Sequence, residues 1–387
     1  MMTDYQIVWR GQVSYTIGGG TACGEYILAL DRLGVDIKID DAFIQDLPEE
    51  DPSKTRRFHY LMNKPYANDK LKILIYDSPP YDIDTKMERK RFDYLMLNTV
   101  WETTRIPSHW FPKIKQFDAV CVPSKQNIAA LKNSGVRIPT FLVPHGAEPH
   151  FFKPENKKLP IRGAEGRFIF VSVFDFQHRK NPEGLLRAYW EEFKPDDKVM
   201  LLIKTHWCGN GNMGHQIREN IWKYKCKLGV QGRTAPIVLL TNTLSRKEIS
   251  GVYTLGHTFV LPTRGEGVGL PFIEALSSGI PVIATGWGGQ MDFLNKRNSF
   301  LVNYQLEYPG RRMDHAISPV YRSLFDEKGQ LWAEPDLKHL KKLMRHAYKN
   351  PELCKIKGWH GRRDMLNFSW DRGGVALKEA IEKTIKK

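Results

Sequence analysis

Residues 264–279 have the sequence RGEGVGLPFIEALSSG, and they follow an apolar run, residues 257–261, that predicts a buried strand. Pro271 suits the first position of a helix, and Gly279 suits the residue just after its end. The segment therefore predicts a strand, a glycine-rich loop and a short helix. Glycines let a backbone approach a ligand closely, and a helix N-terminus presents free N–H groups to an anion.

Two carboxylates flank this anion site. Glu266 lies in the loop, and Glu274 is expected in the first turn of the helix. Because carboxylates repel phosphate, their expected partners are hydroxyl groups, and a phosphate with hydroxyls on both sides describes a nucleotide-sugar. The alternative is a plain glycine turn followed by a solvated helix face, because a glycine loop before a helix is a common pattern.

The two glutamates, with seven residues between them at a loop–helix junction, resemble the signature of retaining family 4 glycosyltransferases of the GT-B fold. The resemblance implies an α/β fold of two Rossmann-like, doubly wound domains that face a cleft, with a C-terminal helix that crosses back to the first domain. It also implies that Glu266 lies by the donor sugar and that Glu274 holds the nucleotide ribose. The backbone expected to face the sugar and the diphosphate is that of Gly267, Val268, Gly269 and Leu270.

The composition is that of a folded protein. The chain has 387 residues, of which 41% are hydrophobic, so it is long for one domain and natural for two. No apolar run approaches the roughly 18 residues needed to span a bilayer, and residues 1–9 lack the core of a signal peptide. Five scattered cysteines, an odd number, argue for reduced thiols. These features predict a cytoplasmic protein, with the inner face of the membrane as a further location.

The chain is basic, with 58 Lys and Arg residues against 43 Asp and Glu residues and a net charge of +15. Such a balance favours anionic partners: a nucleotide diphosphate, an anionic membrane surface that carries a lipid acceptor, or nucleic acid. Plain solubility charge is the alternative. Residues 54–62 and 105–113 mix bases with aromatic side chains. That mixture suits a membrane interface, although stacking on nucleic-acid bases uses the same residue types.

Short apolar runs rich in β-formers alternate with helical patterns, which is typical of doubly wound α/β sheets. Residues 150–166 contain prolines, glycines and charges without an apolar period, and they predict a domain boundary. With the resemblance, we expect a Rossmann-like acceptor-side domain over residues 1–155 and a Rossmann-like nucleotide-sugar donor domain over residues 156–370. Residues 371–387 are expected to form the helix that returns to the N-terminal domain.

A second strand–turn–helix segment, residues 173–182, brings two cations to the N-terminus of a helix. Cations and a helix N-terminus both attract an anion, so together they form a suitable site for a diphosphate. The segment resembles the family's turn that places an arginine and a lysine on the donor diphosphate. Lys180 matches that lysine, but Asp175 occupies the usual arginine position, so Arg179 is the expected substitute. The alternative is a pair of solvated charges at a helix start.

Two further donor contacts are expected. Lys204 ends a predicted strand and would face the donor, with a plain surface lysine as the alternative. Gly18, Gly19 and Gly20 follow the first predicted strand, where family members carry a glycine-rich turn that faces the donor across the cleft. The alternative is a plain β–α turn, which needs only one such glycine.

Three residues are candidates for the acceptor side. Glu102 and His109 lie in the region where many family members have a cleft histidine, although neither takes that position. His145 belongs to a Pro-His-Gly turn that ends the first half of the chain, and it is either a ligand contact or a hinge residue.

Metal binding is not expected. His206, Cys208, His215 and Cys226 have a spacing that fits no standard zinc site. We expect no metal and no cofactor, with the nucleotide-diphosphate-sugar as a co-substrate.

The sequence therefore predicts a retaining, metal-independent glycosyltransferase in which Glu266, Lys180 and Arg179 form the catalytic group. The expected reaction moves a sugar from a nucleotide-diphosphate-sugar to a hydroxyl acceptor. Because family 4 members commonly act on such acceptors, a lipid-linked or cell-envelope glycan is favoured, with peripheral membrane association. Three alternatives stay open: a glycosyltransferase that modifies nucleic acid, a nucleotide-sugar epimerase, and a non-catalytic sugar-nucleotide-binding protein.

Overall fold

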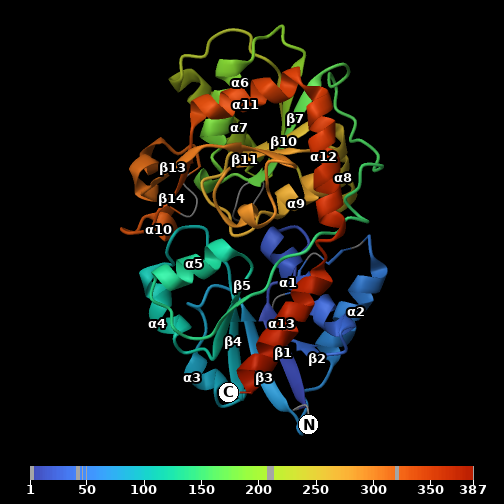
Figure 1. The fold of residues 1–387 in the computed structure, drawn as a ribbon, viewed down its shortest axis with the longest axis vertical. Coiled ribbons are helices and arrows are strands. Elements are labelled where there is room, and N and C mark those ends of the chain that lie inside the picture. The colour runs from blue at the N-terminus through green and yellow to red at the C-terminus, as the bar shows by residue number, and fades with distance from the viewer. Residues whose placement is uncertain are drawn as a thin grey trace. The chain divides into compact units, whose positions relative to one another are not determined.

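The computed structural model describes residues 4–40, 44–45, 47–48, 50–206, 213–318 and 322–386. The chain divides into two compact units (Figure 1). The first unit comprises residues 1–146 together with residues 368–387, and the second comprises residues 147–367. None of the described helices combines the length and the apolar character that crossing a bilayer requires.

The first unit is built on a six-stranded sheet with the order β2-β1-β3-β4-β5-β6, in which every neighbouring pair is parallel. Its central strands are buried on both faces, since Ile7, Val8, Ile73 and Leu74 are fully buried. The strands are β1 (Tyr5–Gly11), β2 (Asp36–Ile39), β3 (Leu71–Asp77), β4 (Tyr94–Asn98), β5 (Ala119–Val122) and β6 (Thr140–Leu142). The helices are α1 (Gly18–Arg32), α2 (Pro52–Asn63), α3 (Thr85–Glu88), η2 (Ser108–Trp110), α4 (Phe111–Ile114), α5 (Lys125–Asn133) and α13 (Trp370–Ile385).

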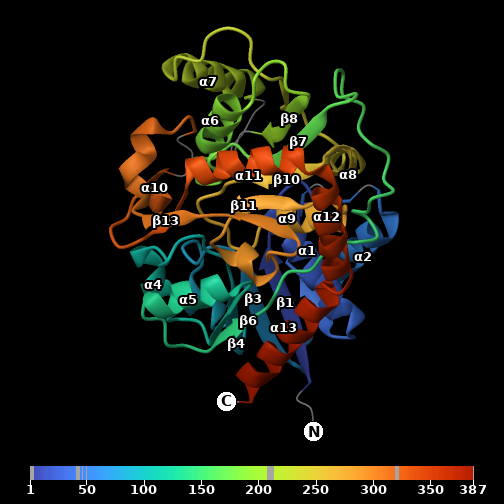
Figure 2. The ribbon, with the colours of Figure 1, turned by 45° about the horizontal axis from the view of Figure 1, so that its top comes forward.

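The last helix, α13, packs along α1 in the first unit (Figure 2). Two adjacent glycines allow this close approach, because a Cβ on Gly374 would lie 2.7 Å from the Cβ of Ala29, and one on Gly373 would collide with the carbonyl of Pro144. The ring of Trp370 meets that of Tyr26 edge to face at 5.3 Å. The predicted return of the C-terminal helix to the first domain is confirmed.

The second unit contains another six-stranded parallel sheet, with the order β12-β11-β10-β7-β8-β9, and a two-stranded antiparallel hairpin. The strands are β7 (Phe168–Asp175), β8 (Val199–His206), β9 (Ile237–Leu240), β10 (Thr258–Leu261), β11 (Val282–Thr285), β12 (Ser299–Val302), and β13 (Tyr304–Glu307) with β14 (Trp332–Pro335) in the hairpin. The helices are η3 (His178–Lys180), α6 (Pro182–Glu192), α7 (Gly214–Lys227), α8 (Arg246–Leu255), α9 (Leu270–Ser277), η4 (Gly289–Asp292), η5 (Pro309–His315), α10 (Arg322–Phe325), α11 (Leu337–Lys349) and α12 (Pro351–Leu366).

The order of this sheet creates a switch point at β7. From β7 the chain first adds β8 and β9 on one side, and it later adds β10, β11 and β12 on the other side. The loops that leave the carboxyl ends of β7 and β10 therefore start next to each other. Open α/β sheets bind ligands at such a point.

Side-chain caps set several helix starts. Ser245 and Glu248 form a reciprocal capping box at the start of α8. Ser124 accepts a hydrogen bond from the backbone N–H of Asn127 at the start of α5. At the end of α9, Gly279 has a φ of +76°, the left-handed conformation that glycine adopts without strain.

The division between the units lies earlier in the chain than the expected position after residue 155. Residues 147–152 pack on the second unit, because the ring of Phe152 meets that of Tyr253 at 5.9 Å and Glu148 forms an ion pair with Arg246. The prolines and glycines of residues 150–166 lie within the second unit, after the division. The stretch of prolines and glycines therefore indicates a loop close to the domain boundary, not the boundary itself.

Candidate active site

Two loops at the switch point are joined by backbone and side-chain hydrogen bonds. They are the turn between β7 and α6 and the loop between β10 and α9. The backbone N–H of Arg264 donates to the carbonyl of Arg179 at 2.7 Å, and the side-chain amide of Asn181 donates to the carbonyl of Pro262 at 3.0 Å. Arg179 also donates to the carbonyl of Gly265. The two loops therefore hold each other in one arrangement.

The predicted catalytic residues come together at this junction. The Nζ of Lys180 lies 2.7 Å from Oε1 of Glu266, and Nη1 of Arg179 lies 3.3 Å from Oε2 of the same carboxylate. All three side chains are buried, with 8%, 8% and 4% exposure for Lys180, Arg179 and Glu266. Burial raises the pKa of Glu266, but Lys180 and Arg179 outweigh it and hold that pKa below its usual value. The carboxylate therefore stays ionised, and two cations face one anion.

Asn181 shapes the start of α6. Its φ is 59°, which is a left-handed backbone conformation. Among the described residues other than glycine, Asn181 alone has a positive φ. Asparagine tolerates this conformation better than most residues, because its short polar side chain bonds locally. Here Oδ1 accepts from the backbone N–H of Gly184 at 2.9 Å and caps the helix. The N-terminus of α6, with its partial positive charge, begins directly after Lys180.

The glycine loop meets the start of α9 as predicted. Gly269 has a φ of 90°, and a Cβ there would lie 2.5 Å from the ring of Phe272, so only glycine fits. The carbonyl of Glu266 accepts from the backbone N–H of Gly289, which ties the loop to the segment after β11. Gly267, Val268 and Gly269 lead directly into α9, whose first residue is Leu270.

Glu274 is the fifth residue of α9, so it lies one position beyond the first turn in which we expected it. Its carboxylate accepts a hydrogen bond from the hydroxyl of Tyr253 at 2.7 Å. Burial raises the pKa of Glu274 to about 7, although the Tyr253 hydrogen bond and the charge of Arg246 work in the opposite direction. Sequence reasoning missed Tyr253, which comes from α8 and carried no signal other than the apolar period of that helix.

Lys204 lies in β8 opposite Val173 of β7, two residues before the strand ends. It is buried at 6% exposure, and burial lowers the pKa of its ammonium group. Asp175, at the usual arginine position of the resemblance, lies 3.1 Å from Nε2 of His206. The structure therefore supports a buried rather than a surface position for Lys204.

Arg264 is the residue of this region that sequence reasoning quoted without giving it a role. Its side chain is buried, its Nε lies 2.6 Å from Oε2 of Glu334 in β14, and it also donates to the carbonyl of His178. The carbonyl of Arg264 accepts from the backbone N–H of Ala333 at 2.8 Å. Arg264 thereby ties both loops to the hairpin. A charged residue three positions after the end of an apolar strand was the available signal.

Gly18, Gly19 and Gly20 form the first turn of α1 in the first unit, so the predicted glycine turn before the helix is wrong. A Cβ on Gly20 would lie 2.5 Å from the carbonyl oxygen of Ser14, and this close packing requires the glycine. A Cβ on Gly19 would meet nothing within 4 Å. Packing therefore explains the glycine at position 20 but not the one at position 19.

The acceptor-side candidates also belong to the first unit. His145 packs between the rings of Tyr26 at 5.7 Å and Trp370 at 5.3 Å, and burial lowers its pKa to about 3. This environment favours the hinge interpretation of His145. His109 is exposed, with its ring 6.4 Å from that of Tyr81, and Glu102 is partly buried in the loop after β4.

Among the described residues, no group of three or more His, Cys, Asp and Glu side chains is arranged to hold a metal ion. Of the four residues considered for zinc, Cys208 lies outside the described residues, His206 contacts Asp175, and Cys226 is an exposed free thiol.

Residues 165–307 match the family described as glycosyl transferases group 1. The matched range lies within the second unit. The matched range contains Lys180, Lys204, Glu266 and Glu274, and the family predicted from the sequence is confirmed.

Among curated proteins, the chain is similar to an alpha-monoglucosyldiacylglycerol synthase of Streptococcus pneumoniae. The two are 27% identical over 179 residues, which cover 44% of this chain and 37% of that protein. The chain spans less than half of the length of the curated relatives that it matches.

Two solved structures have the same fold. The sucrose-phosphate synthase of Thermosynechococcus elongatus superposes with a TM-score of 0.66 at 16% identity, covering 98% of this chain and 99% of that one. HepE of Anabaena, in complex with UDP and glucose, superposes with a TM-score of 0.62 at 12% identity, covering 98% and 99%. The predicted α/β fold of GT-B type, with two Rossmann-like units, is confirmed.

Proposed function

We propose that this chain is a retaining, metal-independent glycosyltransferase that moves a sugar from a nucleotide-diphosphate-sugar to a hydroxyl acceptor. The buried trio of Lys180, Arg179 and Glu266 at the start of α6 is the observation that carries the proposal. It lies in the range that matches the glycosyltransferase family. Two cations and a helix N-terminus suit a diphosphate, and the single carboxylate among them suits sugar hydroxyls.

The chemistry follows from where charge develops. As the bond between the sugar C1 and the phosphate oxygen breaks, negative charge grows on the leaving diphosphate. Lys180, Arg179 and backbone N–H groups stabilise that charge without a metal. The acceptor hydroxyl attacks from the face that the diphosphate leaves, and a diphosphate oxygen takes the hydroxyl proton. Glu266 orients the sugar through its hydroxyls, and no side chain is required as a nucleophile.

Glu274 suits the ribose for a reason that the sequence did not contain. With a pKa of about 7, its carboxyl group exists in both protonation states near neutral pH. It can therefore either accept or donate a hydrogen bond to a ribose hydroxyl. The hydroxyl of Tyr253 fixes the direction of the carboxyl group.

For the acceptor, we propose a lipid-linked or cell-envelope glycan at the inner face of a membrane. The curated relative is named as a synthase of a glucosyl lipid, and HepE was solved with UDP and glucose. In the first unit, α2 carries an exposed Tyr60, at 54% exposure, with the guanidinium of Arg57 over its ring at 4.5 Å. Exposed aromatic and basic groups together suit an anionic lipid surface.

The reaction is tested by incubating the protein with a panel of UDP-, GDP- and ADP-sugars and detecting the products by mass spectrometry. We expect a freed nucleoside diphosphate together with a glycoside or free sugar. Lys180→Ala should slow this release strongly, while Lys153→Ala, which changes an exposed lysine of the same unit, should not. An isomerised donor would identify an epimerase instead, and binding without any product would identify a non-catalytic sensor.

The acceptor surface is tested separately. Co-sedimentation with anionic vesicles and binding to duplex DNA are measured in the same salt. We expect vesicle association that falls when Arg57 and Tyr60 are both changed to alanine. Tight DNA binding with a steep salt dependence, and no vesicle association, would favour the nucleic-acid alternative.

A further inference from the structure

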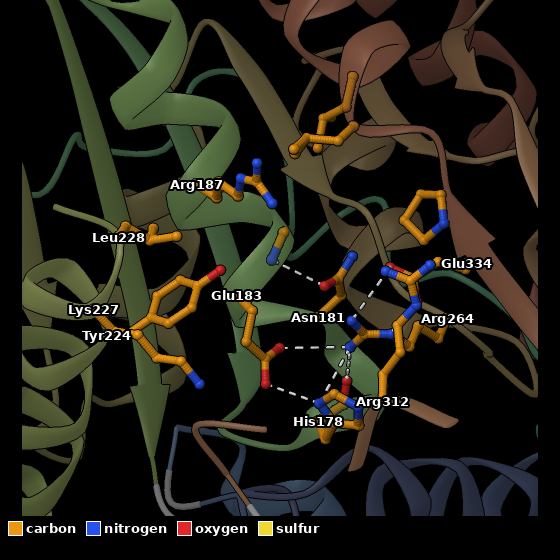
Figure 3. A pocket seen from close by; sticks show the side chains of 14 residues that line it. His178, Asn181, Glu183, Arg187, Tyr224, Lys227, Leu228, Arg264, Arg312 and Glu334 are labelled. Atoms are coloured by element: carbon orange, nitrogen blue, oxygen red, sulfur yellow. Dashed lines mark hydrogen bonds and ion pairs between the residues drawn. The ribbon is translucent and has the colours of Figure 1, made fainter. Parts of the chain in front are cut away.

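The second unit contains a pocket of about 450 Å³ beside the candidate active site (Figure 3). Side chains from η3, α6, α7, η5, β14 and α11 line it, together with Arg264. Lys180 and Glu266 are not among the residues that line it. A pocket of this size is within the range of small-molecule sites.

The carboxylates of this pocket are engaged by internal partners. Oε1 of Glu183 accepts from Nδ1 of His178 at 2.8 Å and from the backbone N–H of Ile317 at 2.9 Å. Glu334 holds Arg264, with 2.6 Å between Oε2 and Nε. These buried ion pairs satisfy one another, so they do not provide the negative charge that a cationic ligand needs.

The cations at the outer part of the pocket are more available. Arg187 pairs with Glu191 one turn away, and both side chains are partly exposed, at 47% and 33%, so the pair is worth little. Lys227 forms no ion pair with any described residue. Arg312 binds Glu307 through Nε and Nη2, while its Nη1 lies 3.8 Å from Glu334.

Two helices also begin at this pocket. The cap and first turn of α6 contribute Asn181 and Gly184, and the start of α11 contributes Leu337, with Pro335 just before it. Each helix N-terminus carries a partial positive charge that favours an anion. The start of α6 also serves the donor site, so cations from three separate elements and the start of α11 are the features that point to an anionic ligand.

The remaining lining is apolar or polar without charge. Figure 3 shows Tyr224 and Leu228 beside Lys227 and Arg187 on one side of the pocket. His178 is buried at 3% exposure, and burial lowers the pKa of its imidazole, which favours the neutral ring. In the neutral ring, with Nδ1 donating to Glu183, Nε2 is an acceptor. That Nε2 has no hydrogen-bond partner among the described residues. A buried acceptor of this kind suits a ligand hydroxyl or an ordered water.

We propose that this pocket binds a small phosphorylated molecule, with the phosphate against Arg187 and Lys227 and the body of the molecule against Tyr224 and Leu228. The site is distinct from the donor site, because its cations do not include Lys180 or Arg179. It is nevertheless close to that site along the chain. His178 precedes Arg179 and Lys180 in the same turn, and Arg264 precedes Glu266 by two residues.

The test is calorimetric titration of the whole chain with inorganic pyrophosphate. The double variant Arg187→Gln/Lys227→Gln removes the two phosphate contacts, and Lys90→Gln/Lys132→Gln is a matched control that changes two exposed lysines of the first unit. Lys180→Ala impairs the donor site instead. Thermal unfolding of each variant checks that it is folded.

We expect the pocket variant to bind pyrophosphate at least about tenfold more weakly, because two charge-assisted hydrogen bonds are lost. Lys180→Ala and the matched control should retain a pyrophosphate site of wild-type affinity. The proposal is overturned if the wild type binds no pyrophosphate, if the pocket variant binds it as the wild type does, or if Lys180→Ala alone abolishes binding.

Discussion

The buried carboxyl group of Glu274 should make the second unit less stable as the pH rises. Its pKa is about 7 in the folded protein, against an ordinary value of 4.5. Below pH 4.5 the group is neutral in both states and costs nothing. Between pH 4.5 and 7 the unfolded chain releases the proton while the folded chain keeps it, so ionisation favours unfolding. A difference of about 2.5 pKa units corresponds to about 3 kcal/mol of unfolding free energy, lost across that window and then constant.

Glu274→Gln isolates this contribution, because glutamine is neutral at every pH and its carbonyl oxygen can still accept from Tyr253. Urea unfolding of the wild type and the variant is followed from about pH 4.5 to about pH 8. We expect the variant to gain up to about 3 kcal/mol relative to the wild type across this range, with the gain levelling off above pH 7. Glu352→Gln is the control, since that side chain is 77% exposed and forms an ion pair with Lys355.

Comparing the two proteins at each pH removes the effect of other groups. Asp77 in the first unit, whose pKa burial raises to about 6, gives a slope of the same sign in both proteins. If the stability curves of the wild type and Glu274→Gln run parallel with pH, Glu274 is ionised in the folded protein and the reasoning from burial is wrong.

Three further outcomes are expected. Lys180→Ala should lower kcat more than it raises KM, because negative charge on the diphosphate grows in the transition state; an intact kcat with a raised KM would make the lysine a ground-state anchor. Glu274→Ala should weaken binding of the cognate nucleoside diphosphate by about 1.5–3 kcal/mol in calorimetry, through loss of a charge-assisted hydrogen bond to the ribose; unchanged affinity would exclude that role. Activity should persist in EDTA, because cations and helix N-termini take the place of a metal; complete loss that Mg²⁺ or Mn²⁺ restores would contradict metal independence.

Patterns within a few residues of each other predicted the elements around the site. The predicted apolar run before Arg264 is β10, and Asn181 and Ser245 cap the helices that follow them. Such signals are local, because a cap or a buried strand depends on neighbours in the chain. They sufficed to place both loops at the carboxyl ends of strands.

The contacts between those loops could not be predicted from local patterns. The ion pair of Lys180 with Glu266 joins residues 86 positions apart, and the hydrogen bond of Tyr253 to Glu274 joins two different helices. Local patterns assign the cations to a phosphate and the carboxylates to hydroxyls, and they do not indicate that Glu266 and the cations contact each other. Side-chain pairing across a sheet depends on which strands are neighbours. The order of the strands cannot be predicted from the sequence of any single segment.

Glycine positions were harder to interpret than charged ones. Gly18, Gly19 and Gly20 have the composition of a turn, yet they begin α1. The close approach of Ser14 to Gly20 favours this arrangement. A run of glycines does not by itself indicate which neighbouring segment packs against it.

The position of α13 sets the order in which the chain can fold during synthesis. The helix covers Tyr26 and Ala29 of α1, but it follows the whole second unit in the sequence. At roughly 5–20 residues per second, a ribosome needs on the order of 10–50 s to pass from residue 146 to the end of α13. Throughout that interval the second unit can complete its sheet, while the apolar side of α1 is not yet buried by α13. The first unit to emerge from the ribosome is therefore the last to reach its native packing.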